Sequence, residues 1–122
     1  MLPKQNRLST RHQFKKVRYL SKKYNQEIVS PYFYLSYSYT DPEAPTEVGF
    51  VIGTKLLKSA VARNRLKRVF RGCVRERLSD IKNGYWIVII PRKASIEAPY
   101  EKISADINKA IQNICISGQT RN

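Results

Sequence analysis

Hydrophobic residues recur every three or four positions in three segments of the chain, a spacing typical of helices that pack one face on a core. The segments span residues 8–23, about 60–78 and 95–116. The stripe of the second segment is the longest and comprises Leu66, Val69, Phe70, Cys73, Val74 and Leu78. Each segment is therefore predicted to be a helix that buries one face.

Three other segments, 27–39, 48–55 and 85–93, are rich in aromatic and β-branched residues, which favour strands. In the segment 27–39, the odd positions from residue 33 onward are more hydrophobic than the even ones. We therefore expect the odd side chains to face the core and the even ones to be accessible. Pro31 leaves two options, two short strands or one strand with an irregular start. The third segment contains the apolar run YWIVII, which predicts a strand covered on both faces.

Four glycines interrupt these patterns. Gly49 and Gly53 lie in a predicted strand, where glycine often marks a bulge or a close approach of another segment. Gly84 follows the second helix and is expected to adopt a left-handed turn. Gly72 lies inside that helix at a cost of ~1 kcal/mol relative to alanine, and the sequence offers no reason for it.

The order of these elements is helix, two or three strands, helix, strand, helix. This order predicts an α+β fold in which helices pack on a small sheet. A chain of 122 residues supports one hydrophobic core. We therefore expect a single domain over residues 1–116 and a frayed tail over residues 117–122.

The charge of the chain is strongly unbalanced, with 23 Lys and Arg against 9 Asp and Glu and a formal net charge of +14. Self-repulsion of this size opposes compaction unless a polyanion binds, and nucleic acid or an anionic membrane can supply one. No apolar run approaches the ~20 residues of a membrane span. The N-terminal stretch MLPKQNRLSTRH also lacks the apolar core of a secretion signal. We expect a cytoplasmic protein that binds nucleic acid.

The positive charge is concentrated around the second helix. One acid, Glu76, accompanies nine basic residues, which are Lys55, Lys58, Arg63, Arg65, Lys67, Arg68, Arg71, Arg75 and Arg77. A solvated helix face normally pairs opposite charges four residues apart, whereas here like charges repeat at that spacing. A merely solvated face is the alternative, but binding of a polyanion explains the pattern better.

The residue types favour nucleic acid as that polyanion. Arginine predominates over lysine in the segment, and its planar guanidinium binds phosphate through two parallel hydrogen bonds. Asn64 can pair with a base edge or a sugar hydroxyl, because its amide both donates and accepts. This chemistry alone does not distinguish RNA from DNA.

The Arg-Asn-Arg motif at residues 63–65 and the segments around it resemble the protein subunit of bacterial ribonuclease P. VGFVIGTK followed by SAVARNRLKRVFR is similar to the family signature, and the matching residues are Arg63, Asn64, Arg65, Lys67, Arg68 and Arg71. NRLSTRHQFKKV looks like the opening helix of the family, with Arg7, Leu8 and Phe14 in place. YWIVIIPRKAS falls where the family has an apolar strand followed by a basic residue.

The resemblance implies a small basic partner of a large catalytic RNA. That complex removes the 5′ leader of precursor tRNA by hydrolysing one phosphodiester, with Mg²⁺ bound mainly by RNA. The implied fold has the order α-β-β-β-α-β-α, a mixed sheet of about four strands and a left-handed βαβ crossover, of the ribosomal protein S5 domain 2-like type. The expected partners are therefore ribonuclease P RNA and precursor tRNA.

Two binding surfaces follow from the resemblance. The residues expected to bind the RNA subunit are Lys58, Arg63, Asn64, Arg65, Lys67, Arg68, Arg71 and Arg75. Those expected to bind the leader, in a cleft between the first helix and the sheet, are Phe14, Arg18, Tyr34, Ser36, Val51 and Lys55. The chain departs from the family pattern at Arg18, where many members have a second aromatic residue. It also has Thr54 in place of the first lysine of a pair, and Ser36 where a tyrosine is common.

No catalytic residue is expected in the polypeptide. His12 is the sole histidine, and no Ser-His-Asp, Cys-His or Glu-x-x-His arrangement is visible. The nine acids are scattered and form no two-metal motif. Cys73 and Cys115 have neither a zinc nor a disulfide spacing, and both fall at apolar helix positions, so we expect them to be buried.

Three alternatives use the same features. A structural RNA-binding protein of the ribosomal type would use the basic helix without supporting cleavage. A DNA-binding helix-turn-helix is disfavoured, because the basic helix follows a strand and no short partner helix precedes it. A membrane-surface helix is disfavoured, because the apolar stripe is needed for the core.

Overall fold

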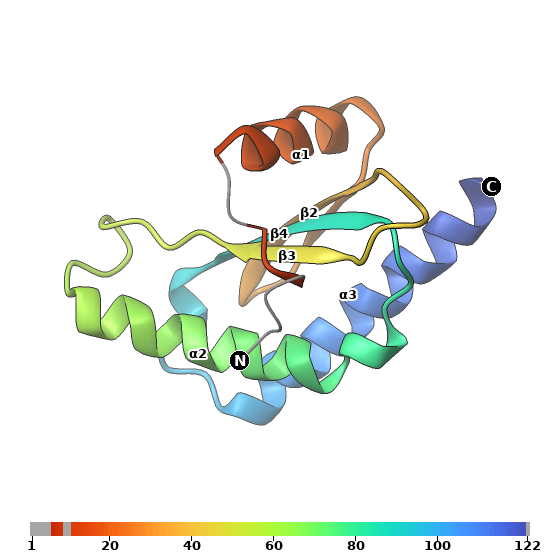
Figure 1. Ribbon diagram of the computed structural model, residues 1–122. Helices are drawn as coiled ribbons and strands as arrows, with labels where there is room; N and C mark the ends of the chain where they lie inside the picture. Colours follow the sequence, from red (N-terminus) through yellow and green to blue (C-terminus); the bar gives the residue numbers. More distant parts are fainter. Residues whose placement is uncertain (1–5, 9–10, 122) are drawn as a thin grey trace.

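The computed structural model describes residues 6–8 and 11–121, with three α-helices and four strands among them (Figure 1). In chain order these are α1 (Arg11–Lys23), β1 (Glu27–Val29), β2 (Phe33–Tyr39), β3 (Glu47–Phe50), α2 (Ala60–Glu76), β4 (Tyr85–Pro91) and α3 (Tyr100–Arg121). Two short 3-10 helices, Leu78–Asp80 and Lys93–Ser95, follow α2 and β4. The α+β class and the order of elements are confirmed, whereas the division at residue 116 stays a prediction.

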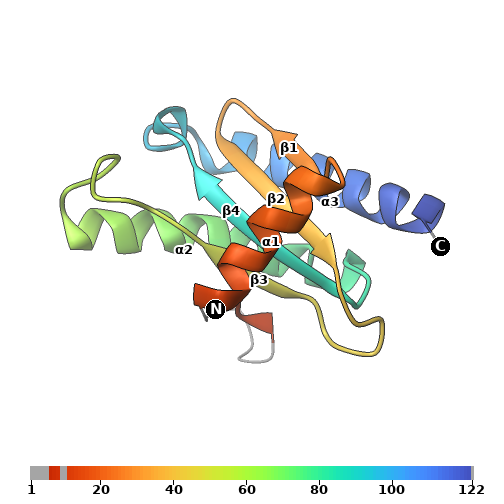
Figure 2. The same cartoon turned by 90° about the horizontal axis from the view of Figure 1, so that it is seen from above.

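The strands form one mixed sheet in the order β1-β2-β4-β3. β2 is antiparallel to β1 and β4, and β3 is parallel to β4. When Figure 2 is turned so that β3 and β4 point upward, β4 lies to the right of β3 and α2 lies behind the sheet. The crossover through α2 is therefore left-handed, as the family resemblance implies and against the usual rule for such connections.

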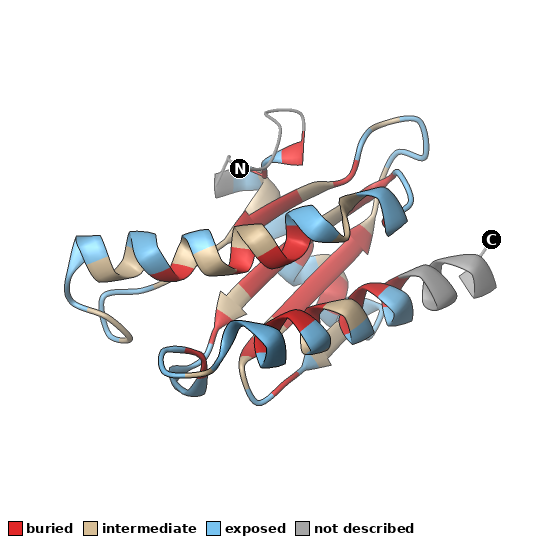
Figure 3. Ribbon diagram, turned by 90° about the horizontal axis from the view of Figure 1, so that it is seen from below, coloured by how far each residue is buried: buried red, intermediate tan, exposed pale blue. Residues whose placement is uncertain are grey.

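The main core lies between the sheet and the two helices α2 and α3 (Figure 3). Of the odd positions of β2, Phe33, Leu35 and Tyr37 are buried on this face as predicted, and Tyr39 is half-buried against the same core. Phe33 meets Phe70 of α2 edge to face, with 6.1 Å between the ring centroids. Ile103 and Ile107 add α3 to the same cluster. Each such side chain contributes about 1.5–3 kcal/mol when fully buried, so this layer is the main source of hydrophobic stabilisation.

Helix α1 covers part of the opposite face of the sheet, where Leu8, Val17 and Val88 are buried together. The packing of α1 on this face shows that the expected accessibility of the even positions of β2 is wrong. Ser36 and Ser38 are buried, and Ser36 pairs with Val88 on the strand that α1 contacts. The alternation along β2 predicted the two faces but not the helix that lies on the second one.

Two segments end or divide differently from the simplest prediction. The segment 27–39 forms two strands, β1 and β2, with Pro31 in the turn between them. β3 ends at Phe50 and not at residue 55, and residues 51–59 are irregular. The N–H groups of Leu56 and Leu57 both donate to the carbonyl of Gly53, at 3.2 and 3.3 Å, so the chain turns there.

The third predicted helix begins later than expected. α3 starts at Tyr100 and not at residue 95, because Pro99 precedes it and the N–H of Lys102 donates to the Pro99 carbonyl at 3.1 Å. Proline is favoured at helix starts, where its missing N–H has no partner to lose. Among the described residues, no helix is long and apolar enough to cross a membrane.

The four glycines lie in different structural surroundings. Gly84 has a φ of 100°, so the predicted left-handed turn is confirmed. The close approach predicted at Gly49 is confirmed. At Gly53, no atom of the described residues other than its chain neighbours lies within 4 Å of a built Cβ, and the residue lies outside β3, so the prediction of a close approach or a bulge there is wrong. A Cβ on Gly72 would lie 3.4 Å from the hydroxyl oxygen of Tyr100. A methyl group would therefore fit at position 72, and the packing of α3 on α2 gives no steric reason for this glycine.

Candidate nucleic-acid interface

Helix α2 presents cationic residues outside its buried stripe. The Ser59 hydroxyl caps the helix by accepting from the Ala62 N–H at 3.3 Å, and buried Leu66 and Phe70 fix its rotation on the core. Among the residues predicted to bind the RNA subunit, the exposed ones are Lys58, Asn64, Arg65, Arg68 and Arg75. The half-buried ones are Arg63, Lys67 and Arg71. The structure therefore brings all eight to one helix and its preceding loop.

Arg63 has a structural role that the sequence did not indicate. Its Nη1 donates to the backbone carbonyls of Leu57 and Lys58, at 2.7 and 2.8 Å. These hydrogen bonds tie the loop before α2 to the first turn of the helix. Because arginine has five N–H donors, the remaining donors of Arg63 are still able to meet a phosphate.

The single acid of α2 is held by the neighbouring helix. The hydroxyl of Tyr100 donates to Oε1 of Glu76 at 2.6 Å. This hydrogen bond raises the pKa of Tyr100, because it stabilises the protonated phenol against a carboxylate. Burial raises the pKa of the Cys73 thiol, and Cys73 is buried as predicted. The side chain of Cys115 lies outside the described part of the chain.

A groove of about 290 Å³ lies where α1, the edge strand β3 and α2 meet. Its lining consists of Arg7, Leu8, Phe14, Val48, Gly49, Phe50, Lys67 and Arg71. The groove therefore joins an aromatic residue predicted to bind the leader with two cations predicted to bind the RNA subunit. The two predicted surfaces are continuous at this point.

Phe14 reaches the groove because position 49 has no side chain. A Cβ on Gly49 would lie 2.5 Å from Cζ of Phe14 and 3.0 Å from Cβ of Leu8. The ring lies against the backbone of β3, half-buried, beside the cluster of Val17 and Val88. It thus packs on the sheet and still presents part of its surface to the groove.

The other predicted leader residues fall into three groups. Tyr34 is half-buried on the sheet face that α1 covers in part, and Val51 is 41% exposed just beyond β3. Arg18 on α1 and Lys55 in the loop before α2 are exposed. Ser36 is 1% exposed on the same face, which leaves almost no surface for the predicted direct contact with a leader.

Sequence reasoning missed Ile90 and Phe50 as candidate contact residues. β4 was predicted to be covered on both faces, yet Ile90 is half-buried opposite Tyr34 in the sheet register. Phe50 is half-buried in the groove lining. Alternation could not identify them, because both belong to nearly unbroken apolar runs. Sequence reasoning also missed the contact between Lys16 and Trp86, in which Nζ of the lysine lies 5.6 Å from the centroid of the ring.

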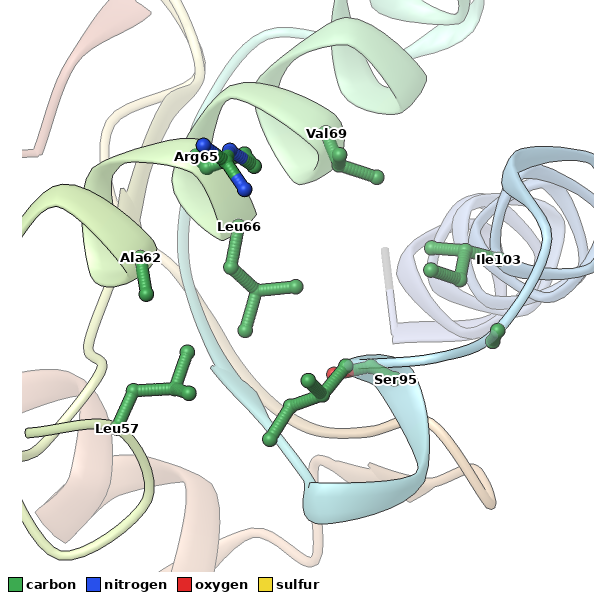
Figure 4. A pocket seen from close by; sticks show the side chains of 9 residues that line it. Leu57, Ala62, Arg65, Leu66, Val69, Ser95 and Ile103 are labelled. Carbon is green, nitrogen blue, oxygen red and sulfur yellow. The ribbon is translucent and has the colours of Figure 1, made fainter. Parts of the chain in front are cut away.

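A second pocket, of about 180 Å³, lies between α2, the segment 95–98 and the start of α3 (Figure 4). Its lining is mainly aliphatic, from Leu57, Ala62, Leu66, Val69, Ile96, Ala98 and Ile103, with Arg65 on the α2 side. The hydroxyl of Ser95, the other polar side chain there, donates to the Arg92 carbonyl at 2.6 Å. The pocket therefore offers little convergent polar chemistry to a ligand.

Metal-binding side chains do not gather in the structure. Within residues 6–8 and 11–121, no group of three or more His, Cys, Asp or Glu could hold a metal ion. The predicted interface residues offer cations, aromatic rings and the amide of Asn64 for binding.

Comparisons with known proteins agree with this chemistry. A family model described as Ribonuclease P matches residues 2–115. The ribonuclease P protein component of Rippkaea orientalis is 36% identical over 122 residues, covering 98% of this chain and 95% of its own. That of Pseudanabaena sp. is 32% identical over 111 residues, covering 91% and 92%.

Solved structures share the fold. The ribonuclease P protein of Thermotoga maritima superposes with a TM-score of 0.72 at 22% identity, covering 88% of this chain and 96% of that one. The Staphylococcus aureus protein gives a TM-score of 0.70 at 20% identity, covering 90% and 94%. The family model and the two sequence relatives each extend over nearly the whole chain, and on this ground the chain belongs to the family of ribonuclease P protein components.

Proposed function

We propose that this chain, as the protein component of the tRNA-processing enzyme ribonuclease P, binds the catalytic RNA through α2 and the 5′ leader of precursor tRNA through the adjoining groove. The observation that carries the proposal is the groove at β3, where the ring of Phe14 and the cations Lys67 and Arg71 line one surface. A half-buried aromatic ring beside two cations suits an unpaired nucleotide, because the base can stack while the phosphates are neutralised.

The contact with the RNA subunit is assigned to the exposed face of α2 and to Lys58. Arg65, Arg68 and Arg75 are exposed there, and Arg63 holds the loop that carries Lys58. Phosphate contacts release counterions from the RNA, so this part of the affinity falls steeply with salt. Asn64, exposed between two arginines, is the residue that can add a base or ribose contact.

The leader is assigned to the groove and to the adjoining sheet face. Tyr34 and Ile90 are paired in the register and half-buried. The Val51 N–H donates to the backbone carbonyl of Ile89 at 3.0 Å, so Val51 lies alongside β4. These three side chains continue the apolar surface beyond Phe14. Arg18 and Lys55 supply charge at its margins, whereas Ser36 is removed from the proposed site.

The bond-breaking step is assigned to the RNA subunit. Mg²⁺ would be held mainly by RNA phosphate oxygens, and the protein would contribute by positioning and by lowering the repulsion between two polyanions. No proton transfer is assigned to a side chain of this protein.

Binding assays with two substrates test the leader assignment. The holoenzyme is assembled with ribonuclease P RNA, and its affinity is measured for precursor tRNA and for mature tRNA without a leader. Phe14→Ala should lower affinity for the precursor about tenfold, since stacking on one base contributes about 1–3 kcal/mol, and leave affinity for mature tRNA unchanged. Arg68→Ala should instead weaken assembly with the RNA.

Substitution of a groove cation tests whether the RNA-subunit face and the leader site are joined at Lys67 and Arg71. Because they line the groove with Phe14, Arg71→Gln should weaken both assembly and the preference for the precursor. If Phe14→Ala weakens binding of precursor and mature tRNA equally, the groove does not hold the leader. If no variant of α2 changes assembly, the RNA-subunit face is wrongly assigned.

A further inference from the structure

The outer face of α1 is a second cationic surface, distinct from α2. The helix sequence RHQFKKVRYLSKK contains six Lys or Arg and no acid, and no Asp or Glu occurs before Glu27. α1 and α2 lie on opposite sides of the sheet (Figure 1). The cations of α1 therefore do not belong to the face assigned to the RNA subunit.

An exposed tyrosine lies at the centre of this surface. Tyr19 is 58% exposed, and helical geometry makes it a neighbour of Lys15, Lys22 and Lys23, at four residues before and three and four after. All three lysines are exposed as well. Val17, on the opposite side of the helix, is fully buried, so the core fixes Tyr19 outward.

The charge arrangement is unfavourable for the isolated protein. Arg18 and Lys22 repeat at four residues and Lys15 and Arg18 at three, both spacings at which like charges repel. The helix dipole disfavours a cation in the first turn, the position of Arg11, but favours Lys22 and Lys23 in the last turn. A bound polyanion would relieve the repulsion between the like charges.

We propose that the outer face of α1 is a second RNA-binding surface that takes an unpaired nucleotide, with its base stacked on Tyr19 and its phosphates on Lys15 and Lys22. An unpaired base is required because a base within a duplex does not offer its face to a side chain. The proposal goes beyond the proposed function, which uses α2 and the groove of Phe14. With one cationic face on each side of the sheet, a single chain can hold two RNA segments at once.

An anionic membrane fits this surface less well. A membrane-surface helix buries a wide apolar face in the lipid boundary, and the apolar face of α1 is already packed on the sheet through Val17. Lys16 and Lys23 are placed over aromatic rings, at 5.6 Å from Trp86 and 5.5 Å from Tyr24. Tyr24, just after the helix, is exposed as well, but Lys23 lies over its ring, so Tyr19 is the exposed tyrosine ring of the helix itself.

Photo-crosslinking tests the stacking contact directly. The full-length protein is mixed at about 0.15 M salt with a single-stranded RNA of about eight nucleotides that contains 5-iodouridine, and crosslinked peptides are mapped by mass spectrometry. The proposal predicts a crosslink at Tyr19 that persists in the Arg65→Ala/Arg68→Ala background. It therefore remains measurable even if the role assigned to α2 is wrong.

Affinity measurements separate stacking from diffuse charge. In that same background, Tyr19→Ala should weaken RNA binding about tenfold, and Tyr19→Phe should retain it because the ring remains. Lys15→Gln/Lys22→Gln should weaken binding more than the matched change Lys102→Gln/Lys109→Gln on exposed α3 positions. Circular dichroism verifies the fold of each variant.

Three outcomes would overturn the proposal. These are crosslinks confined to Phe14 or other residues outside α1, equal losses from the α1 and α3 lysine pairs, or unchanged affinity in Tyr19→Ala. Tyr19-dependent binding to vesicles of anionic phospholipid, without the RNA crosslink, would assign the surface to a membrane instead.

Discussion

The ring of Phe14 occupies the space that a side chain at position 49 would fill, since a Cβ on Gly49 would lie 2.5 Å from its Cζ. The first helix and the edge strand are therefore fitted to each other through these two residues. Phe14 is held on the sheet and lines the groove at the same time, so the geometry of the proposed leader site depends on the absence of a side chain at Gly49, which also lines the groove.

Gly49→Ala should displace the Phe14 ring and destabilise the protein by about 1–3 kcal/mol, the usual cost of overpacking. Preference for precursor over mature tRNA should fall with it. Urea unfolding and the two-substrate binding assay measure the two effects.

A double mutant provides the control for this pair. In a Phe14→Leu background the smaller side chain leaves room, so Gly49→Ala should cost clearly less than in the wild type. Additive effects of the two substitutions would contradict the contact, because residues in contact are expected to be coupled.

Arg63 and Arg68 should behave differently although both belong to the basic motif. Arg68 is exposed, so Arg68→Ala should reduce the salt dependence of assembly with ribonuclease P RNA by about 0.9 in log–log slope. Arg63 binds the carbonyls of Leu57 and Lys58. Arg63→Gln should therefore also speed hydrogen exchange in residues 53–59, which Arg68→Ala should leave unchanged. Equal exchange in both variants would show that Arg63 does not order the loop.

The glycines at positions 72 and 84 should respond oppositely to alanine. A Cβ on Gly72 makes ordinary contact with Tyr100 at 3.4 Å, so Gly72→Ala should stabilise α2 by up to about 1 kcal/mol. Gly84 has a φ of 100°, and a Cβ there would lie 2.8 Å from the Tyr39 ring. Gly84→Ala should therefore destabilise the protein by more than about 1 kcal/mol, and thermal unfolding at neutral pH compares the two.

Stability should decline at alkaline pH because of Cys73. Its pKa in the folded protein is raised above the ordinary 9.0, mainly by burial, so the unfolded chain loses this proton first. The free energy of unfolding should accordingly be unaffected by this group below about pH 9 and should fall as the pH rises above it, until the thiol of the folded protein ionises as well. Cys73→Ala should show a shallower decline in urea unfolding, and an unchanged slope would exclude the thiol as the cause.

The elements of the fold were largely predictable, because periodicity reports which face of an element is buried. The odd positions of β2 and the stripe from Leu66 to Val74 face the main core as predicted. Ser36 was predicted to be accessible but is buried, because helix α1 packs on its face of the sheet. Alternation along β2 carries no information on a helix from another part of the chain. The early end of β3 was missed because residues 51–55 retain an apolar and β-branched composition.

The site was predictable in its residue types and less so in its geometry. The Arg-Asn-Arg motif identified α2, but the two hydrogen bonds from Arg63 to the loop carbonyls depend on how residues 53–59 turn. The meeting of Phe14 with Lys67 and Arg71 depends on β3 being the edge strand next to both helices. These relationships arise from tertiary packing, which residue spacing does not encode.

Cleavage of precursor tRNA under limiting Mg²⁺ tests the central claim, that the protein assists an RNA that performs the reaction. At about 0.15 M salt, the purified protein and a bacterial ribonuclease P RNA should together release the 5′ leader much faster than the RNA alone. The nuclease-treated protein alone should release none. Cleavage by the protein without RNA, or no acceleration when both are present, would contradict the account.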